Sequence, residues 1–259
     1  MPKETKETKK TTAGGIRWRL WLGVAAFAVA GVTSAIAGLK VREFALTDPQ
    51  FTLSRDRKGA LEIQGLQYAS GARVARVFAG DFEHSIFSVP LDERRRRLLA
   101  VDWVEDAAVS RIWPDRLIVR VRERKPVAFV FFRSGVLLID PRGVLLSPPP
   151  QAQFTFPVLS GVRENENESQ RRERVRCLLR VQEELGSPFQ DVSEVNAADP
   201  DNIRIVAQVN HGTVELILGD RNFAARYRNF LKHFPEMLKS SPGARTFDLR
   251  LDDRIMAED

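Results

Sequence analysis

A run of 20 uncharged residues near the N-terminus, Leu20 to Leu39, constrains the fold of this chain more than any other feature. A helix needs about 20 apolar residues to cross the ~30 Å hydrocarbon core of a bilayer. The run contains no proline that would break such a helix. The sequence therefore predicts a transmembrane helix over residues 20–39.

The residues before this run indicate its orientation. Arg17 and Arg19 flank it, and Trp18 and Trp21 stand at the same border, where aromatic rings favour the membrane interface. Because basic flanks stay in the cytoplasm, we expect residues 1–19 to form a cytoplasmic tail and the remaining body to lie outside the cytoplasm.

A cleavable signal peptide is the competing interpretation. Ala35-Ile36-Ala37 resembles an A-x-A cleavage site. The apolar region of a signal peptide usually has about 7–15 residues, however, and this run is longer. The length favours a retained anchor.

The net charge of +6 raises nucleic acid as a partner, but its distribution argues against one. The first 19 residues carry six bases and two acids, which leaves 34 bases and 32 acids in the other 240 residues. The run Arg94 to Arg97 lies on a predicted helix, where four consecutive residues face all sides. We expect Arg95 to lay its stem along the apolar face and the other three to face solvent.

After the membrane segment the pattern reads strand, helix, helix, strand, strand. A strand is predicted at 61–66, helices at 70–79 and 91–99, and a hairpin at 107–122. Three strands with two helices packed on one face make a small α+β layer.

The second strand of the hairpin alternates without a break after the turn Trp113-Pro114-Asp115-Arg116. The residues of one face are Leu117, Val119 and Val121, and those of the other are Ile118, Arg120 and Arg122. We expect the first face to be buried and the hairpin to present Arg120 and Arg122 on its surface.

The second half of the chain is rich in predicted strands, and turn residues separate them. An amphipathic helix is predicted over 170–185, a hairpin over 203–218, a second helix around 223–234 and a final strand over 246–252. The fold class expected from this order is α+β, with a mainly antiparallel β domain and flanking helices at the end.

Side chains for catalysis are not arranged in any recognisable pattern. The three histidines, His84, His211 and His233, lie far apart, and Cys177 is the only cysteine and has the pattern of a core residue. Glycine-rich phosphate loops and nucleophile motifs are absent from the sequence. We expect no enzyme activity, no metal and no cofactor.

Strands that end at a sheet edge offer another kind of function. An exposed edge presents unpaired N–H and C=O groups, to which a strand of a partner can add. The final predicted strand carries charge on one face, and it can equally be an ordinary paired strand.

These patterns resemble the FtsQ/DivIB family of bacterial cell-division proteins over nearly the whole chain. The string from Trp103 to Ala128 is similar to the end of the POTRA domain of that family. The matching segments of the β domain are Asp140 with Gly143, Phe156 to Gly161, Leu218-Gly219, Phe230 to Pro235 and Phe247-Asp248-Leu249-Arg250.

The resemblance implies a domain order of cytoplasmic tail, membrane helix, POTRA domain over 50–126 with the order β-α-α-β-β, and β domain over 127–259. It implies a non-enzymatic scaffold of the cell inner membrane at the division septum, single-pass with its N-terminus in the cytoplasm and its bulk in the periplasm. Such a scaffold would recruit and regulate the proteins of septal cell-wall synthesis.

The resemblance also implies partners. The terminal strand would pair with FtsB, in a complex with FtsL, and FtsK, FtsW and FtsI are further expected divisome partners. The residues carried over as the partner edge are Thr246, Asp248, Arg250, Leu251 and Asp252, with Arg250 expected to bind a carboxylate of the partner. The family commonly has Tyr where this chain has Leu251, followed soon by Gly where Asp252-Asp253-Arg254 stands.

The alternative class is a POTRA-containing component of transport or of outer-membrane assembly, which would also use strand addition. Such proteins usually carry several POTRA repeats or a barrel, whereas this sequence predicts one POTRA-like unit and no run of barrel strands. A cell-wall enzyme is the third possibility, and it lacks a nucleophile or metal pattern.

Overall fold

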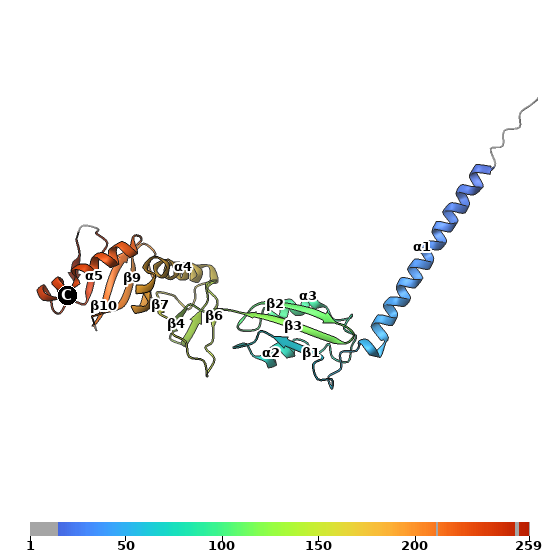
Figure 1. The fold of residues 1–259 in the computed structure, drawn as a ribbon, viewed down its shortest axis with the longest axis horizontal. Coiled ribbons are helices and arrows are strands. Elements are labelled where there is room, and N and C mark those ends of the chain that lie inside the picture. The colour runs from blue at the N-terminus through green and yellow to red at the C-terminus, as the bar shows by residue number, and fades with distance from the viewer. Residues whose placement is uncertain (1–14, 211, 252–253, 259) are drawn as a thin grey trace, which may run out of the picture. The chain divides into compact units, whose positions relative to one another are not determined.

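The computed structural model describes residues 15–210, 212–251 and 254–258, with side chains from residue 24 onward. These residues form two compact units (Figure 1). The first comprises the described residues up to Gln64 together with 72–97 and 108–120. The second comprises 65–71, 98–107 and the described residues from Val121 onward.

The first unit begins with α1 (Gly15–Thr47), which is longer than the predicted span of 20–39. Its part from Val24 to Thr47 is long and apolar enough to cross a membrane, and none of it is buried. The α-helix ends before Pro49, because proline disfavours helical backbone in the residue that precedes it. Asp48 then caps the short 3₁₀ helix η1 (Pro49–Phe51) by accepting the N–H of Gln50 at 2.9 Å.

A three-stranded sheet with two helices follows in the predicted order. Its elements are β1 (Leu61–Gln64), α2 (Gly71–Arg76), α3 (Leu91–Leu98), β2 (Val104–Ile112) and β3 (Arg116–Glu123). The strand order is β1-β3-β2, and β1 runs parallel to β3. The β-α-α-β-β arrangement is therefore confirmed.

The alternation predicted for β3 is also confirmed. Leu117 and Val119 are fully buried and Val121 is 8% exposed. Arg120 and Arg122 on the other face are exposed. A strand that buries every second residue in this way fixes its own register, since a slip of one residue would bury the arginines.

The prediction for the arginine run of α3 is wrong in one respect. Arg95 is exposed, and the packed residue of the run is Arg94. The guanidinium of Arg94 donates two hydrogen bonds, of 2.6 and 2.8 Å, to the carboxylate of Asp81, which is 5% exposed. This bidentate ion pair, rather than apolar contact, selects which arginine of the run turns inward.

The second unit contains a nine-stranded sheet in the order β12-β11-β10-β9-β8-β7-β4-β5-β6. Five of its eight strand pairs are antiparallel, which agrees with the mainly antiparallel β domain expected. The strands are β4 (Ala128–Phe132), β5 (Gly135–Ile139), β6 (Leu145–Leu146), β7 (Val158–Ser160), β8 (Val192–Asn196), β9 (Ile203–Val209), β10 (Gly212–Gly219), β11 (Thr246–Asp248) and β12 (Met256–Glu258).

Two long helices cover one face of this sheet, α4 (Glu168–Leu185) and α5 (Phe223–Ser240). Asn167 begins α4 with a capping box, in which its side chain accepts the N–H of Gln170 and the Gln170 side chain accepts the N–H of Asn167. The apolar sides of both helices share one core cluster with alternate residues of β9 and β10. Cys177 belongs to this cluster, as its pattern predicted.

Candidate partner-binding edge of the β domain

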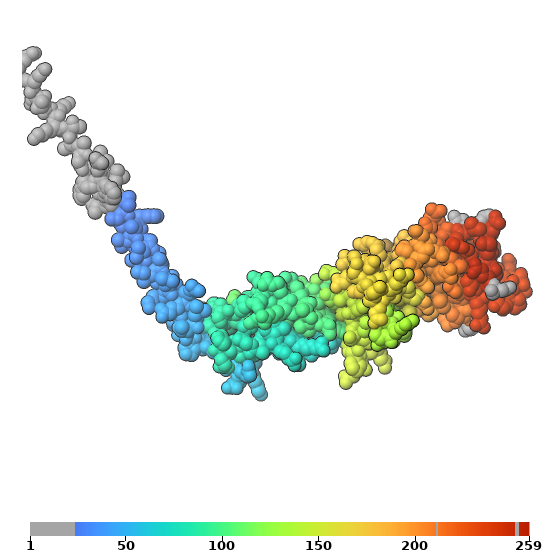
Figure 2. Space-filling view, turned by 180° about the vertical axis from the view of Figure 1, so that it is seen from behind, coloured from blue at the N-terminus to red at the C-terminus, as the bar shows by residue number. Residues whose placement is uncertain are grey.

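One end of the nine-stranded sheet is formed by the last described residues of the chain. β12 is the end strand of the sheet order, and it pairs antiparallel with β11, placing Thr246 opposite Glu258 and Asp248 opposite Met256. All three residues of β12 are exposed, and the space-filling view shows the C-terminal residues at the surface of this domain (Figure 2). The edge of β12 that faces away from β11 has no neighbouring strand among the described residues.

The hydrogen bonds of β11 show which backbone groups of β12 point outward. Leu249 donates its N–H to Ile217 of β10 at 2.9 Å, and the Arg245 carbonyl accepts the N–H of Glu215 at 2.8 Å. Because successive residues of a strand direct these groups to opposite sides, Phe247 also faces β10, and its two neighbours in β11 face β12. Ala257, which lies opposite Phe247, therefore directs its own N–H and C=O to the open edge.

The chain leaves β11 at Asp248, four residues before the predicted end of that strand. The Asp248 carboxylate accepts the backbone N–H of Arg250 at 3.0 Å, an arrangement that turns the chain. It also accepts the guanidinium of Arg250, at 2.9 Å from Nε to Oδ1 and 2.6 Å from Nη2 to Oδ2. The prediction of one strand over 246–252 is therefore wrong, because a side chain competes with the ladder for the backbone N–H.

The charges of this pair shift the pKa of both groups. Hydrogen bonding to Arg250 lowers the pKa of Asp248, although burial of the carboxyl group acts in the opposite direction. The same contact raises the pKa of Arg250. Both groups are thus charged at neutral pH, and the guanidinium is already held by a carboxylate of its own chain.

A buried arginine of α5 fixes the chain beyond this turn. Arg226 is 6% exposed and donates from Nη1 to the Leu218 carbonyl at 2.5 Å and from Nη2 to the Arg250 carbonyl at 2.8 Å. Gly219 has a φ of +76°, and a Cβ there would lie 2.9 Å from Nη1 of Arg226 and 3.2 Å from Cγ of Arg250. Glycine at this position therefore makes room for both arginines.

Aromatic rings attach α5 to β11. Phe230 and Phe234 of α5 lie with their ring centroids 5.2 and 5.7 Å from that of Phe247. All three rings are buried. The start of α5 is fixed by Glu184 of α4, which accepts the N–H of Phe223 at 2.9 Å. The helix that borders the sheet edge is thus held at both its start and its middle.

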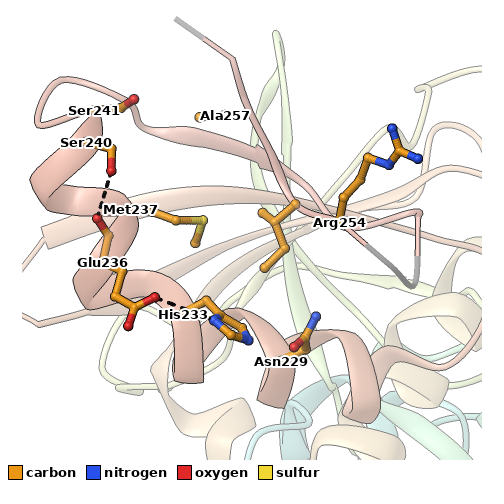
Figure 3. Close-up of a pocket in the computed structure, with 9 residues that line it drawn as sticks. Asn229, His233, Glu236, Met237, Ser240, Ser241, Arg254 and Ala257 are labelled. Carbon is orange, nitrogen blue, oxygen red and sulfur yellow. Dashed lines mark hydrogen bonds and ion pairs between the residues drawn. The ribbon is translucent and has the colours of Figure 1, made fainter.

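A pocket of about 570 Å³ lies between α5 and the C-terminal segment (Figure 3). Asn229, His233, Glu236, Met237, Ser240 and Ser241 line one side, and Arg254, Ile255 and Ala257 line the other. A second hollow shares Asn229 and Ile255 with it and extends to Leu249 and Leu251. We call the two hollows together the α5 groove, and it runs beside β12.

The predicted partner-edge residues lie close to this groove but are not the outermost strand. Thr246 is in β11, the Asp248 carboxylate is buried, and Arg250 is bound by Asp248. Leu251 is 44% exposed in a bend and lines the groove. Asp252 lies outside the described residues.

β12 itself was not predicted from the sequence. Its three residues are too few to show alternation, and Ile255, which is half-buried against the core cluster, is the only apolar signal just before it. The turn at Asp248 would have been a usable signal, because an aspartate followed two residues later by arginine can close such a turn.

The other predicted site residues lie elsewhere. Arg122 is 63% exposed and forms ion pairs with Glu105 at 3.3 Å and Asp106 at 3.8 Å. Arg120 is an exposed residue of β3. Arg17 and Arg19 are in α1, and their side chains are not described.

The described part of the chain contains no group of three or more His, Cys, Asp or Glu side chains that could hold a metal ion. His233 lies in α5 next to Glu236, with 3.9 Å between Nδ1 and the nearer carboxylate oxygen. His211 lies outside the described residues. The arrangement that the structure does offer is an open strand edge beside a partly apolar groove, which suits the binding of an extended peptide.

This chain is similar to known bacterial proteins over most of its length. The family model described as "POTRA domain, FtsQ-type" matches residues 59–124. The "Cell division protein FtsQ" of Koribacter versatilis is 35% identical over 237 residues, which cover 89% of this chain and 68% of that protein. The proteins of the same name from Bordetella pertussis and Zymomonas mobilis are 36% and 33% identical over 41% and 40% of this chain, and over about a third of their own length (36% and 34%).

The similarity to the Koribacter protein extends well beyond the POTRA match and so includes the β domain as well as the first unit. The resemblance to the FtsQ/DivIB family that the motifs indicated is thereby confirmed. The chain belongs to the FtsQ family of cell division proteins.

Proposed function

We propose that this chain is a non-enzymatic scaffold of the division machinery that captures a β-strand of FtsB, in a complex with FtsL, on the open edge of β12. The observation that carries the proposal is the outward orientation of the Ala257 backbone at the end of the sheet. An unpaired N–H and C=O at a sheet edge are the groups that strand addition uses.

The α5 groove supplies the side-chain part of this proposal. Leu251 is 44% exposed and lines the groove with Met237 and Ile255, so an apolar side chain of the added strand would lose contact with water there. Backbone bonds give affinity without sequence preference, whereas pockets for alternate side chains give specificity. The groove would therefore select which strand is captured.

The residues expected from the sequence to form the partner edge have a different role in this proposal. They are Thr246, Asp248, Arg250, Leu251 and Asp252. The Asp248–Arg250 turn shapes the approach to the edge, and Leu251 contributes apolar surface. Arg250 is 48% exposed in its side chain and can offer a second contact to a partner carboxylate while Asp248 holds it. β12 rather than β11 provides the pairing groups.

The membrane arrangement that we propose has α1 in the inner membrane, the N-terminus in the cytoplasm and the POTRA domain (50–126) and β domain (127–259) in the periplasm at the septum. The length and exposure of α1 and the basic residues before it support this orientation. The hairpin surface with Arg120 and Arg122 is then available to further divisome proteins, and FtsK, FtsW and FtsI are the candidates.

A pull-down from a detergent extract of membranes tests the proposal. The full chain is compared with a chain that ends at Arg254, which lacks β12 but keeps β11 and the aromatic contacts of Phe247. We expect FtsB and FtsL to co-purify with the full chain and to be lost with the shorter one. Equal recovery from both chains would contradict strand capture at β12.

Localisation separates this proposal from a role in transport or outer-membrane assembly. A fluorescent fusion of the full chain should gather at the septum of dividing cells. A uniform distribution around the cell would favour the transport class instead.

A further inference from the structure

Trp113 is exposed to an unusual degree for a tryptophan of a folded domain. It lies at the turn between β2 and β3, and 66% of its surface is exposed. Trp103 of the same chain is 3% exposed, and its Nε1 donates to the Ser147 carbonyl at 3.0 Å. A large apolar ring with one polar N–H is suited to a boundary between an apolar phase and water.

Aromatic contacts hold Trp113 near the end of α1. The ring of Phe51 lies 5.1 Å from that of Trp113, 5.2 Å from that of Phe87 and 5.7 Å from that of Phe44, measured between centroids. Phe44 belongs to α1 and is itself 51% exposed. A second contact supports this arrangement, since Ser85 donates its hydroxyl to the Ala45 carbonyl of α1 at 2.6 Å.

The position of these rings relative to the bilayer follows from helix geometry. Phe44 comes five residues after Leu39, the last residue of the uncharged run, which is a rise of about 7.5 Å along a helix. The polar layer on each side of a bilayer is roughly 5–8 Å thick. Phe44 and the rings packed around Phe51 are therefore at the level of the lipid headgroups when α1 spans the membrane.

A basic loop lies beside the same turn. Residues 54–59 carry Arg55, Arg57 and Lys58 and one acid, Asp56, and these four side chains are exposed. Arg57 forms an ion pair with Asp115, two residues after Trp113, so the loop and the turn belong to one surface. Exposed cations next to a bilayer attract the phosphates of lipid headgroups, and the attraction increases with anionic lipid.

We propose that the β2–β3 turn docks on the bilayer that α1 crosses, with the Trp113 ring in the headgroup layer and the basic loop 54–59 facing lipid phosphates. The partner is thus the phospholipid surface itself. Docking would hold the first unit against the membrane and restrict how it turns about the end of α1. The inference depends on α1 crossing the bilayer and does not depend on the capture of any partner strand.

Fluorescence quenching in nanodiscs tests the proposal on the full chain. Trp18→Phe and Trp21→Phe first remove the two tryptophans of the membrane flank, leaving Trp103 and Trp113 as the emitting groups. The nanodiscs contain phosphatidylcholine with a nitroxide on its headgroup, and the same protein with Trp113→Phe is the matched control. We expect quenching with Trp113 present and its loss in the control, because Trp103 is buried in protein.

Equal quenching of the two proteins would overturn the docking of Trp113. The comparison is made on protein that co-purifies with the discs, so that a failure of α1 to insert is seen separately, as protein without lipid. For the basic loop, discs with added phosphatidylglycerol should quench Trp113 more strongly than discs without it, and Lys58→Glu should reduce that gain. An unchanged response to the anionic lipid would overturn the role of the loop.

Discussion

The carboxylate of Asp248 binds Arg250 through both the backbone and the guanidinium, and this contact sets the end of β11. The backbone N–H of Arg250 lies 3.0 Å from Oδ1 and its Nη2 lies 2.6 Å from Oδ2. The chain therefore leaves the sheet at Asp248 and later returns as β12, which lies outside β11. The open edge at this end of the sheet consequently belongs to residues 256–258.

Asp248→Asn should lower the free energy of unfolding at pH 7 by about 1.5 kcal/mol, the low end for a charged hydrogen bond because the Arg250 side chain is about half exposed. The folded pKa of Asp248 is lowered from 3.8, so its contribution is present above that value and is lost as the pH falls through the folded pKa. The difference between the two proteins in detergent should thus shrink in acid below pH ~3.8. Urea unfolding at several pH values measures the difference in free energy of unfolding between the two proteins. A difference that stays constant down to low pH would contradict the role of the charge.

Arg226→Met should destabilise the β domain by about 2 kcal/mol, because the buried carbonyl of Leu218 and the partly buried carbonyl of Arg250 lose their donor. Arg226→Lys should recover only part of this, since an ammonium group lacks the planar fork that reaches both oxygens. Arg228→Met is the matched control, because Arg228 is exposed on the same helix. Thermal unfolding in detergent compares the three, and similar losses for Arg226→Met and Arg228→Met would refute the proposed clamp.

Arg94→Met should cost about 3 kcal/mol of stability, because it leaves the carboxylate of Asp81 buried without its cation. Arg96→Met in the same run should change stability by less than about 0.5 kcal/mol, because Arg96 is exposed. Hydrogen exchange of the amides of α3 reports the difference locally. Equal protection in the two variants would show that the ion pair does not hold this helix.

The thiol of Cys177 should react slowly in the native protein. It is 9% exposed, and burial raises its pKa, so little reactive thiolate forms at neutral pH. Labelling with a maleimide should therefore become rapid only after urea unfolds the domain. A Cys177→Ala, Gln190→Cys variant places the thiol at an exposed position and gives the rate of an accessible group. Native labelling of Cys177 at that rate would contradict its burial.

Sequence periodicity was sufficient for the elements that bury one face over several turns or residue pairs. β3 and α4 are examples, since each repeats its apolar positions often enough to show the period, whereas α1 was predicted from the length of its uncharged run. The order of elements in the first unit followed from the same signals, and the fold class with it.

The outermost strand could not be predicted in this way. β12 has three residues, and its place in the sheet depends on the turn at Asp248 and on contacts of Ile255 with the core cluster. Which arginine of α3 packs inward, Arg94 or Arg95, could not be predicted from the sequence pattern either. It depends on Asp81, which reaches α3 only through the tertiary fold.

The sequence therefore predicted residues that surround the candidate site, but it did not predict the backbone groups that would pair with a partner strand. Asp248, Arg250 and Leu251 surround the edge, whereas Ala257 presents the open backbone. Pattern alone carries no information on which N–H of a strand is unpaired.

The central claim is that the outward N–H of Ala257 pairs with a partner strand. Ala257→Pro removes this donor, whereas Ala257→Val keeps it and adds a side chain suited to a strand. The affinity of the full chain in detergent for a complex of FtsB and FtsL should fall at least about tenfold with proline, as expected for about 1.4 kcal/mol or more. It should fall much less with valine, which keeps the donor although residue 257 also lines the α5 groove. Equal affinities of the two variants would contradict capture at this edge.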